Sequence, residues 1–318
     1  MMIHSFLKAV LGNARIGLVD IGASGGLEPR WRRHSTLVTA FFFEPDQRAL
    51  ARLEIGSGSS NPKIYPFALA ETDGLVTLNL CAKQAVSSVL RPNLDYLARF
   101  PDVERFDIVG QVEVPAHALD SCLSSEEALT VDFFKIDTQG SELLVLQGAQ
   151  RVLATPVIGL EVEVEFQELY ENQPLFGQLC SELKKHGFEL FDFTSICRWN
   201  RRGFSRFGQL AFADALFLRS PEYFADLIST YPESIRREKC LKYFAICALY
   251  NRVDLLSAAQ NKFAASLTPA DLQSIRKRAQ LFAIRDGILS KIFGAVFRII
   301  FRPLGFNFLP VSYEAPNL

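Results

Sequence analysis

Residues 18–26 read Leu18-Val19-Asp20-Ile21-Gly22-Ala23-Ser24-Gly25-Gly26, an apolar run that ends in a glycine-rich turn. The apolar, partly β-branched run predicts a strand, and glycines let the turn backbone approach a ligand or a packed neighbour. A helix that follows such a turn offers unpaired N–H groups to a ligand. The stretch therefore predicts a strand-to-helix turn, which serves either ligand binding or close packing.

Short apolar runs alternate with longer amphipathic stretches from about residue 16 to residue 218, which predicts an α/β fold with a mainly parallel sheet. Continuous apolar runs such as residues 40–43 fit strands that are covered on both faces. The expected strands are Ile16–Ile21, Val38–Glu44, Lys63–Leu69, Val131–Ile136, Val157–Val164, Phe188–Phe193 and Leu210–Leu218. Two further extended segments, Leu75–Leu80 and Ile108–His117, are expected between the third and the fourth of these strands.

The pattern changes after Leu218, because residues 221–280 contain little glycine and have aromatic and aliphatic residues three and four positions apart. This spacing is typical of helices. We therefore expect two units, a core over residues 1–219 and a helical appendage over residues 220–318. Pro221 is also compatible with an ordinary helix start within one unit.

Acidic residues follow the predicted strands at the positions where an α/β sheet binds ligands. Glu44 lies 24 residues after Asp20, and Pro45 ends its strand. In doubly wound folds an acid about 20 residues after the glycine turn accepts hydrogen bonds from ribose hydroxyls. Asp137 follows another buried strand. We expect Asp20, Glu44 and Asp137 to converge on one pocket, although Glu44 could instead cap the next helix.

The order of the motifs resembles that of the FkbM-type S-adenosylmethionine-dependent methyltransferases. The motifs are VDIGASGG, FFFEPD, ALAETDGLVTLNL, SSVL, LDSCL, VDFFKIDTQGSELLVLQGA, LEVEVEFQELYENQPLF, GFEL and ADALFLR, within about residues 16–218. The resemblance implies a class I methyltransferase fold with seven strands, mostly parallel, and an antiparallel last strand. It also implies methyl transfer from S-adenosylmethionine to a hydroxyl oxygen of a sugar, a glycan or a related metabolite.

The resemblance also implies where the cofactor lies. The residues expected around its methionine part are Asp20, Gly22, Ala23 and Gly25, with Asp137 facing the ammonium or the transferring methyl. Glu44 is expected to hold the ribose hydroxyls, and Asp46 with the Ala68-Leu69 backbone to lie near the adenine. An acid-rich site suits a ligand that carries an ammonium and a sulfonium but no phosphate.

Transfer to an alcohol needs a group that accepts the hydroxyl proton. Asp137, Glu163 and Glu165 are our candidates for this base or for substrate contacts, with Glu161, His117 and Asp214 as alternatives. The three glutamates of residues 161–165 alternate with apolar residues and therefore share one strand face. Buried carboxylates need partners, so some of them should reach the cleft or bind a cation. A divalent metal held by Asp137 and one glutamate is possible, but the spacing does not require it.

The basic run Arg30-Trp31-Arg32-Arg33-His34 follows the glycine turn. Two interpretations are open for it. In one, Arg30 or Trp31 meets an anionic or sugar acceptor at the pocket entrance. In the other, the run is a solvated helix face with a single anchoring tryptophan.

The composition limits the possible partners. The net charge of −1 in a chain of 318 residues does not indicate a nucleic-acid partner. No uncharged run reaches a dozen residues, whereas a membrane-spanning helix needs about 20 apolar ones. Six scattered cysteines without metal-ligand spacing, and a start that does not resemble a signal peptide, favour a cytoplasmic protein.

The C-terminal segment accounts for part of the 27 phenylalanines. Residues 285–302 have helical periodicity with a broad apolar face and a narrow stripe of Lys291, Arg298 and Arg302. This pattern predicts, for residues 285–313, either peripheral membrane contact or packing on the core or on a second copy. A non-catalytic binding protein that uses this helical region is the alternative to an enzyme.

Overall fold

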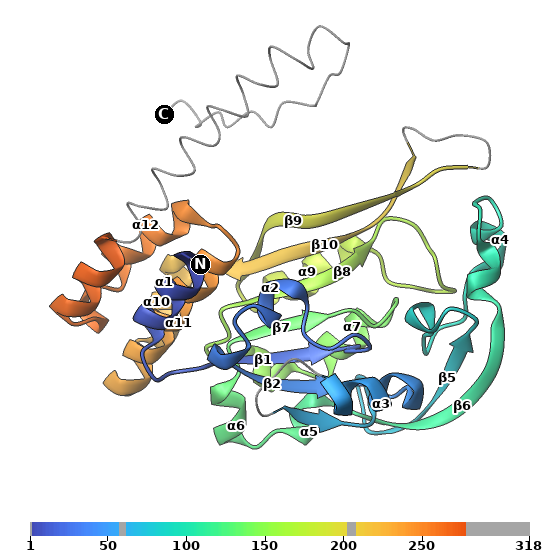
Figure 1. Ribbon diagram of the computed structural model, residues 1–318, viewed down its shortest axis with the longest axis horizontal. Helices are drawn as coiled ribbons and strands as arrows, with labels where there is room; N and C mark the ends of the chain where they lie inside the picture. The colour runs from blue at the N-terminus through green and yellow to red at the C-terminus, as the bar shows by residue number, and fades with distance from the viewer. Residues whose placement is uncertain (1, 57–61, 202–207, 278–318) are drawn as a thin grey trace, which may run out of the picture.

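The computed structural model describes residues 2–56, 62–201 and 208–277, in which a seven-stranded sheet lies between two helical layers (Figure 1). The strands are β1 Ile16–Ile21, β2 Val38–Phe43, β3 Lys63–Tyr65, β4 Ala68–Leu69, β5 Gly74–Cys81, β6 Ile108–His117, β7 Phe133–Ile136, β8 Gly159–Glu165, β9 Phe188–Trp199 and β10 Gln209–Arg219. The helices are α1 Met2–Leu11, α2 Pro29–Arg32, α3 Gln47–Gly56, α4 Leu94–Leu97, α5 Leu119–Cys122, α6 Ser125–Thr130, α7 Glu142–Gln147, α8 Gln150–Leu153, α9 Phe176–Lys185, α10 Pro221–Ile228, α11 Glu233–Leu249 and α12 Val253–Lys262.

The main sheet has the strand order β3-β2-β1-β7-β8-β10-β9. Its pairs are parallel from β3 to β8, and β10, the last strand among the described residues, runs antiparallel to both β8 and β9. The α/β class and the antiparallel last strand are therefore confirmed. The chain order changes direction between β1 and β7, and ligands bind at the carboxyl ends of strands beside such a point.

One predicted strand was wrong. The segment Lys63–Leu69 forms two strands in different sheets, because β3 pairs with β2 whereas β4 pairs with β6 in a small sheet of order β4-β6-β5. Pro66 separates them and has no N–H to donate to a ladder. The chain therefore leaves the main sheet at Pro66, and the two segments expected as extended, β5 and β6, continue the small sheet.

The central strands of the main sheet are buried on both faces, as the apolar runs predicted. Leu18, Phe42 and Phe133 pack on one face with α1 and with α10, α11 and α12, which stand beside α1 in Figure 1. Val19 and Phe134 pack on the opposite face in a second apolar cluster. Residues that alternate along one strand therefore belong to different cores.

The helices after residue 220 share a core with the sheet. Pro221 begins α10, and the Ser220 side chain accepts a hydrogen bond from the Tyr223 N–H at its N-terminus. Tyr243 and Phe244 of α11 are fully buried in the cluster that contains Leu18. The division into units at residues 219 and 220 stays a prediction, since this packing is continuous across it.

A buried ion cluster joins α11 to the sheet. The Asp132 side chain has no exposed surface and accepts a hydrogen bond of 2.7 Å from the Gly17 N–H. It also lies 2.6 Å from the Lys239 Nζ and 2.9 Å from the Lys242 Nζ. Removing one partner of a buried ion pair is costly, because it leaves a charge without solvent or a counter-charge.

We expect Asp132→Asn to lower the free energy of unfolding by about 3 kcal/mol, because an amide cannot neutralise the two lysines. Urea unfolding followed by circular dichroism measures this change. The exposed Asp226 of α10 provides the control Asp226→Asn, which should leave stability unchanged. Equal stabilities of the two variants would contradict a role for Asp132 in holding α11.

Among the described residues, no helix is both long and apolar enough to span a membrane. The predicted membrane or self-association segment, residues 285–313, lies outside the described residues, and so do the stripe residues Lys291, Arg298 and Arg302.

Candidate functional site

A cavity lies at the carboxyl ends of β1, β2 and β7. Its empty space amounts to about 750 Å³, part of it open to solvent, which falls within the range of cofactor sites. The lining residues are Ile21, Gly22, Ser24, Phe43, Glu44, Pro45, Asp46, Ala68, Leu69, Leu78, Gln84, Ala85, Ser87, Ser88, Val89, Asp137, Thr138, Gln139 and Ser141. The cavity therefore brings together six predicted cofactor residues: Gly22, Glu44, Asp46, Ala68, Leu69 and Asp137.

Gly22, directly after β1, contacts the ends of both β2 and β7. It has a φ of +77°, and its N–H donates to the Phe43 carbonyl at 3.0 Å. A Cβ added at this position would lie 1.8 Å from the Asp137 carbonyl oxygen. Only glycine fits both the backbone conformation and the contact, so this glycine of the turn is explained by packing at the cavity floor.

Glu44 lies at the end of β2 and is 5 % exposed. Its Oε1 accepts a hydrogen bond of 2.8 Å from the Asp46 N–H. Burial raises the pKa of Glu44 to about 7, opposed by this hydrogen bond and by the Arg48 charge. A carboxyl in this range switches between acid and carboxylate near neutral pH.

Asp46, rather than Glu44, caps the next helix. Its Oδ1 accepts the Arg48 N–H at 2.8 Å, and its Oδ2 lies 2.6 Å from the Arg48 guanidinium. The Arg48 side chain also donates to the Ser87 Oγ at 3.0 Å. Asp46 lines the cavity while it is held in an ion pair, and its predicted place near the adenine stays a prediction.

Asp20, Ala23 and Gly25 do not line the cavity, in contrast to the other predicted cofactor residues. Asp20 is 5 % exposed, and burial raises its pKa to about 8, with the nearby Lys135 charge acting in the opposite direction. Ala23 is buried in the apolar cluster with α1 and α11, and a Cβ added at Gly25 would meet nothing within 4 Å. Their cofactor contacts remain predictions.

Asp137 is the base candidate that lines the cavity. Its side chain is 38 % exposed and its Oδ2 lies 3.9 Å from the Lys135 Nζ. The Gln139 Nε2 donates to the Asp137 Oδ1 at 2.8 Å and to the Glu163 Oε2 at 2.6 Å. The Tyr170 hydroxyl in turn donates to the Gln139 Oε1 at 2.9 Å, so Gln139 is fixed between the two carboxylates.

The glutamates of β8 share one face of the sheet, as predicted, and all three are buried. Glu161 accepts hydrogen bonds from the Tyr250 hydroxyl at 2.6 Å and from the Arg30 Nη1 at 3.2 Å. It therefore has partners away from the cavity. Glu163 and Glu165 do not line the cavity either, and only Glu163 is linked to it, through Gln139.

The burial of Glu163 and Glu165 raises the pKa of each well above its usual value. The charge of Asp137 adds to the rise for Glu163, and that of Glu142 for Glu165. Burial therefore favours the neutral form of both carboxyls where no cation is bound, and a neutral carboxyl cannot accept a proton from a substrate.

The structure agrees with the second interpretation of the basic run, a solvated face with an anchoring tryptophan, except at Arg30, because Arg32 and Arg33 are exposed. Trp31 is an anchor, 1 % exposed, and packs beside Phe133 and Tyr250. Arg30 is neither fully solvated nor free for an acceptor, because its guanidinium lies 4.1 Å from the centre of the Tyr250 ring and pairs with Glu161.

The remaining base candidates have other partners and do not line the cavity. Asp214 pairs with Lys135 through a distance of 3.1 Å between its Oδ1 and the Nζ. The His117 Nδ1 lies 3.5 Å from the Asp73 Oδ1, and the ring packs against Phe67.

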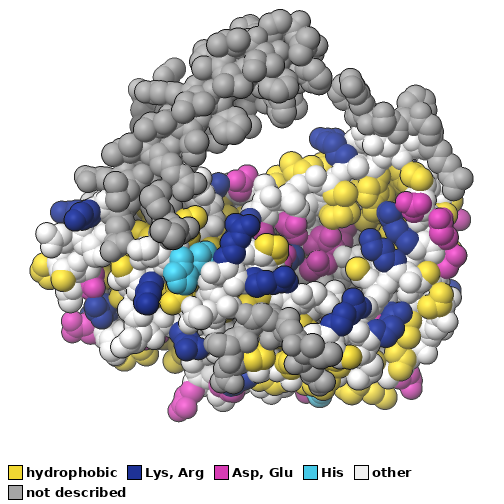
Figure 2. Space-filling view, viewed as in Figure 1, with side chains coloured by type: hydrophobic (Ala, Val, Ile, Leu, Met, Phe, Trp, Pro, Cys, Tyr) yellow, Lys and Arg dark blue, Asp and Glu magenta, His cyan; other side chains and the backbone are white. Residues whose placement is uncertain are grey.

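Acidic side chains gather near the centre of the face shown in Figure 2, with Lys and Arg side chains on either side.

One wall of the cavity carried no assignment from the sequence. Leu78, Gln84, Ala85, Ser87, Ser88 and Val89 line it. The Ser88 Oγ donates to the Gln139 carbonyl at 2.8 Å. The motif SSVL supplies Ser87, Ser88 and Val89, but it is polar and short, with no spacing that indicates a ligand. Its resemblance to the family motif was the only signal that could have located this wall.

Solved structures of several methyltransferases are similar in outline. Precorrin-6y C5,15-methyltransferase from Geobacter metallireducens is 11 % identical, with 68 % of this chain and 87 % of that chain covered and a TM-score of 0.33. An rRNA methylase from Streptococcus thermophilus is 13 % identical, with 69 % of this chain and 95 % of that chain covered and a TM-score of 0.30. The 1,6-didemethyltoxoflavin-N1-methyltransferase from Burkholderia thailandensis was solved with S-adenosylhomocysteine. It is 12 % identical, with 68 % of this chain and 76 % of that chain covered and a TM-score of 0.29.

A search of the curated proteins finds no match. A family model, described as the methyltransferase FkbM domain, matches residues 20–190, a little more than half of the 318 residues. The matched range begins at Asp20, near the end of β1, and includes the cavity residues and all of β8. The chain therefore belongs to the FkbM-domain methyltransferase family.

Proposed function

We propose that this protein transfers a methyl group from S-adenosylmethionine to a hydroxyl oxygen of a sugar, a glycan or a related hydroxylated metabolite. The observation that carries the proposal is the meeting of Glu44 and Asp137 in one cavity at the ends of β2 and β7. The cofactor, when bound, supplies a methyl group activated by a sulfonium. Two carboxylates suit its hydroxyl groups and its positive charges.

Asp137 is the residue that we place at the reacting atoms. In the proposed step the acceptor oxygen forms a bond to the methyl carbon and the bond from that carbon to sulfur breaks. The hydroxyl proton passes to the Asp137 carboxylate, and S-adenosylhomocysteine leaves. Gln139 is a positioning residue, since it holds the Asp137 Oδ1 and is itself held by Tyr170. Such orientation supplies a large part of the acceleration in a displacement reaction.

Two measurements test the proposal in order. Calorimetry with S-adenosylhomocysteine should show one site on the full chain, weakened at least tenfold by Glu44→Ala. Transfer of a labelled methyl group from S-adenosylmethionine into a glycan and metabolite extract, followed by mass spectrometry, should then identify the acceptor. Absence of binding would refute the proposal, and binding without transfer would favour the non-catalytic alternative.

The affinity for S-adenosylhomocysteine should depend on pH through Glu44. Its pKa of about 7 in the free protein means that the carboxyl is mainly protonated at pH 6 and mainly ionised at pH 8. A ribose hydroxyl donates more strongly to the ionised form, so affinity should rise about tenfold from pH 6 to pH 8 and then level off. The charged groups that act on Glu44 are Asp46, Asp137 and Arg48.

The matched variant for this pH dependence is Glu44→Gln, which keeps the size of the side chain. Calorimetry at pH 6, 7 and 8 should give a flatter profile for the variant, and the difference between the two profiles isolates Glu44 from Asp20. Parallel profiles for the two proteins would show that Glu44 does not titrate against the ligand.

A further inference from the structure

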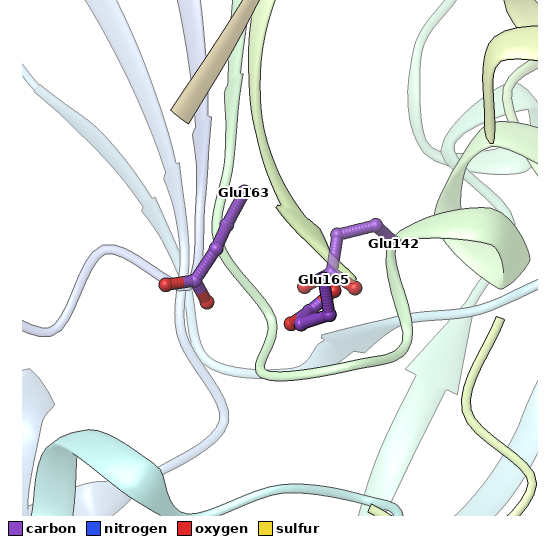
Figure 3. A group of neighbouring side chains, drawn as sticks. All are labelled: Glu142, Glu163 and Glu165. Carbon is purple, nitrogen blue, oxygen red and sulfur yellow. The ribbon is translucent and has the colours of Figure 1, made fainter. Parts of the chain in front are cut away.

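Three buried glutamates lie behind the cavity, outside the proposed catalytic step. Glu142 is the first residue of α7, and Glu163 and Glu165 lie on β8. One carboxylate oxygen of each lies within 4.8 Å of the others, and the residues are 1 %, 7 % and 1 % exposed, respectively. Figure 3 shows the Glu142 and Glu165 carboxylates next to each other, with the Glu163 carboxylate to one side.

Two oxygens of this cluster have no hydrogen-bond partner. The Glu142 Oε1 accepts from the Thr138 N–H at 2.8 Å, the Thr138 hydroxyl at 3.0 Å and the Gly140 N–H at 3.1 Å. Its Oε2 is buried and accepts nothing, and the same holds for the Glu165 Oε2. The carboxylates of these two residues lie next to each other in Figure 3.

The charge of the cluster is not balanced by a basic side chain. Among the described residues, none of the ion pairs includes Glu142, Glu163 or Glu165. Lys135, the buried lysine of the neighbouring strand, pairs with Glu28, Asp137 and Asp214 instead. Buried carboxylates are stable when they are neutral, paired with a cation or bound to a metal.

We propose that Glu142, Glu163 and Glu165 bind a hard divalent cation of the Ca²⁺ or Mn²⁺ type. Carboxylate oxygens are the ligands that such ions prefer, and Ca²⁺ takes them at about 2.3–2.6 Å. Oxygens on opposite sides of one ion are then about 4.6–5.2 Å apart, in accord with a cluster spread of up to 4.8 Å. This ligand set differs from the one that the sequence suggested, because Asp137 is not part of it.

The position of the ion gives it a structural role. Glu142 holds the loop of residues 138–140 through three hydrogen bonds, and Glu163 holds Gln139. Thr138, Gln139 and Ser141 line the cavity. A cation that joins Glu142 to Glu163 therefore fixes the loop that forms the cavity floor, without contact with the methyl donor.

The test uses the full chain, treated with a chelator and then dialysed, with CaCl₂, MnCl₂ or MgCl₂ added and no methyl donor present. We expect Ca²⁺ or Mn²⁺ at 100 times its Kd to raise the Tm by about 5 °C or more. Bound Mn²⁺ should also change its electron paramagnetic resonance spectrum. Glu165→Gln should abolish both effects, whereas the exposed Glu171 provides a control, Glu171→Gln, that keeps them.

Two results would overturn the proposal. Absence of any Tm shift and of bound Mn²⁺ with the wild-type chain would show that the carboxyls are held neutral, and Glu165→Gln should then raise the Tm by itself. An equal response of wild type and Glu165→Gln would place the ion elsewhere. Because no methyl donor is present, either result is independent of the proposed transfer reaction. If the variant fails to fold, the measurement on the wild-type chain still decides whether a cation binds.

Discussion

Asp137→Asn is expected to reduce labelled methyl transfer by about 10²–10⁴-fold, the usual contribution of a general base. The amide has the shape of the carboxylate and can still accept the Gln139 hydrogen bond, but it cannot take up the hydroxyl proton. Affinity for S-adenosylhomocysteine should fall by at most about tenfold, because the cavity shape is retained and only the attraction of the Asp137 charge for the ammonium is lost. Initial rates with the acceptor identified from the labelled extract give the first value, and calorimetry gives the second.

Glu163→Gln tests whether the loss of activity is specific to Asp137 or follows from any change to its neighbours. Glu163 accepts the same Gln139 amide but does not line the cavity, so its replacement should lower the rate far less than Asp137→Asn does. Asp226→Asn, on the exposed surface of α10, controls for the loss of one carboxylate. Full activity of Asp137→Asn, or a larger loss with Glu163→Gln, would remove Asp137 from the catalytic role.

Gly22→Ala is expected to have the largest effect on cofactor binding. The added Cβ would overlap the Asp137 carbonyl oxygen at 1.8 Å, and the φ of +77° disfavours any side chain. Strain and overlap together cost about 4 kcal/mol or more. We expect either a protein that does not fold or one that binds S-adenosylhomocysteine more than about 100-fold more weakly, measured by thermal melting and calorimetry.

Gly25→Ala is the matched control in the same turn. A Cβ at Gly25 meets nothing within 4 Å, so the variant should melt at the wild-type temperature. Its affinity for S-adenosylhomocysteine carries separate information, because a loss without a change in Tm would place the ligand against Gly25, as the family resemblance implies. Wild-type affinity in Gly22→Ala would show that contact between the ends of β1 and β7 does not shape the site.

The sequence predicted the sheet well where burial dictates the pattern. Continuous apolar runs such as Phe41-Phe42-Phe43 can be stable only between two helical layers, and this is where β2 lies. The error at Lys63–Leu69 arose because Pro66 lies in an otherwise strand-like run, and a proline can end a strand or occupy an edge. Which of the two occurs depends on whether β6 is near, and local sequence does not contain that information.

The sequence predicted acidic residues that line the cavity, but not the residues that hold the site in place. Glu44 and Asp137 follow strands directly, so their place at the carboxyl edge follows from the strand assignment. The interactions of Gln139 with Tyr170, and of Glu161 with Arg30 and Tyr250, join residues that are tens of positions apart. No periodicity encodes such pairs, because each depends on how loops and helices close over the sheet.

Because Tyr250 contacts Glu161, we expect that the family domain does not fold as a detachable module in this protein. A chain shortened to residues 1–219 would keep every cavity residue but lose Lys239, Lys242 and Tyr250, which leaves Asp132 and Glu161 as buried acids without these partners. It would also uncover the apolar sheet face that contacts α11. A transfer of this domain into another protein should therefore include the helices that follow it.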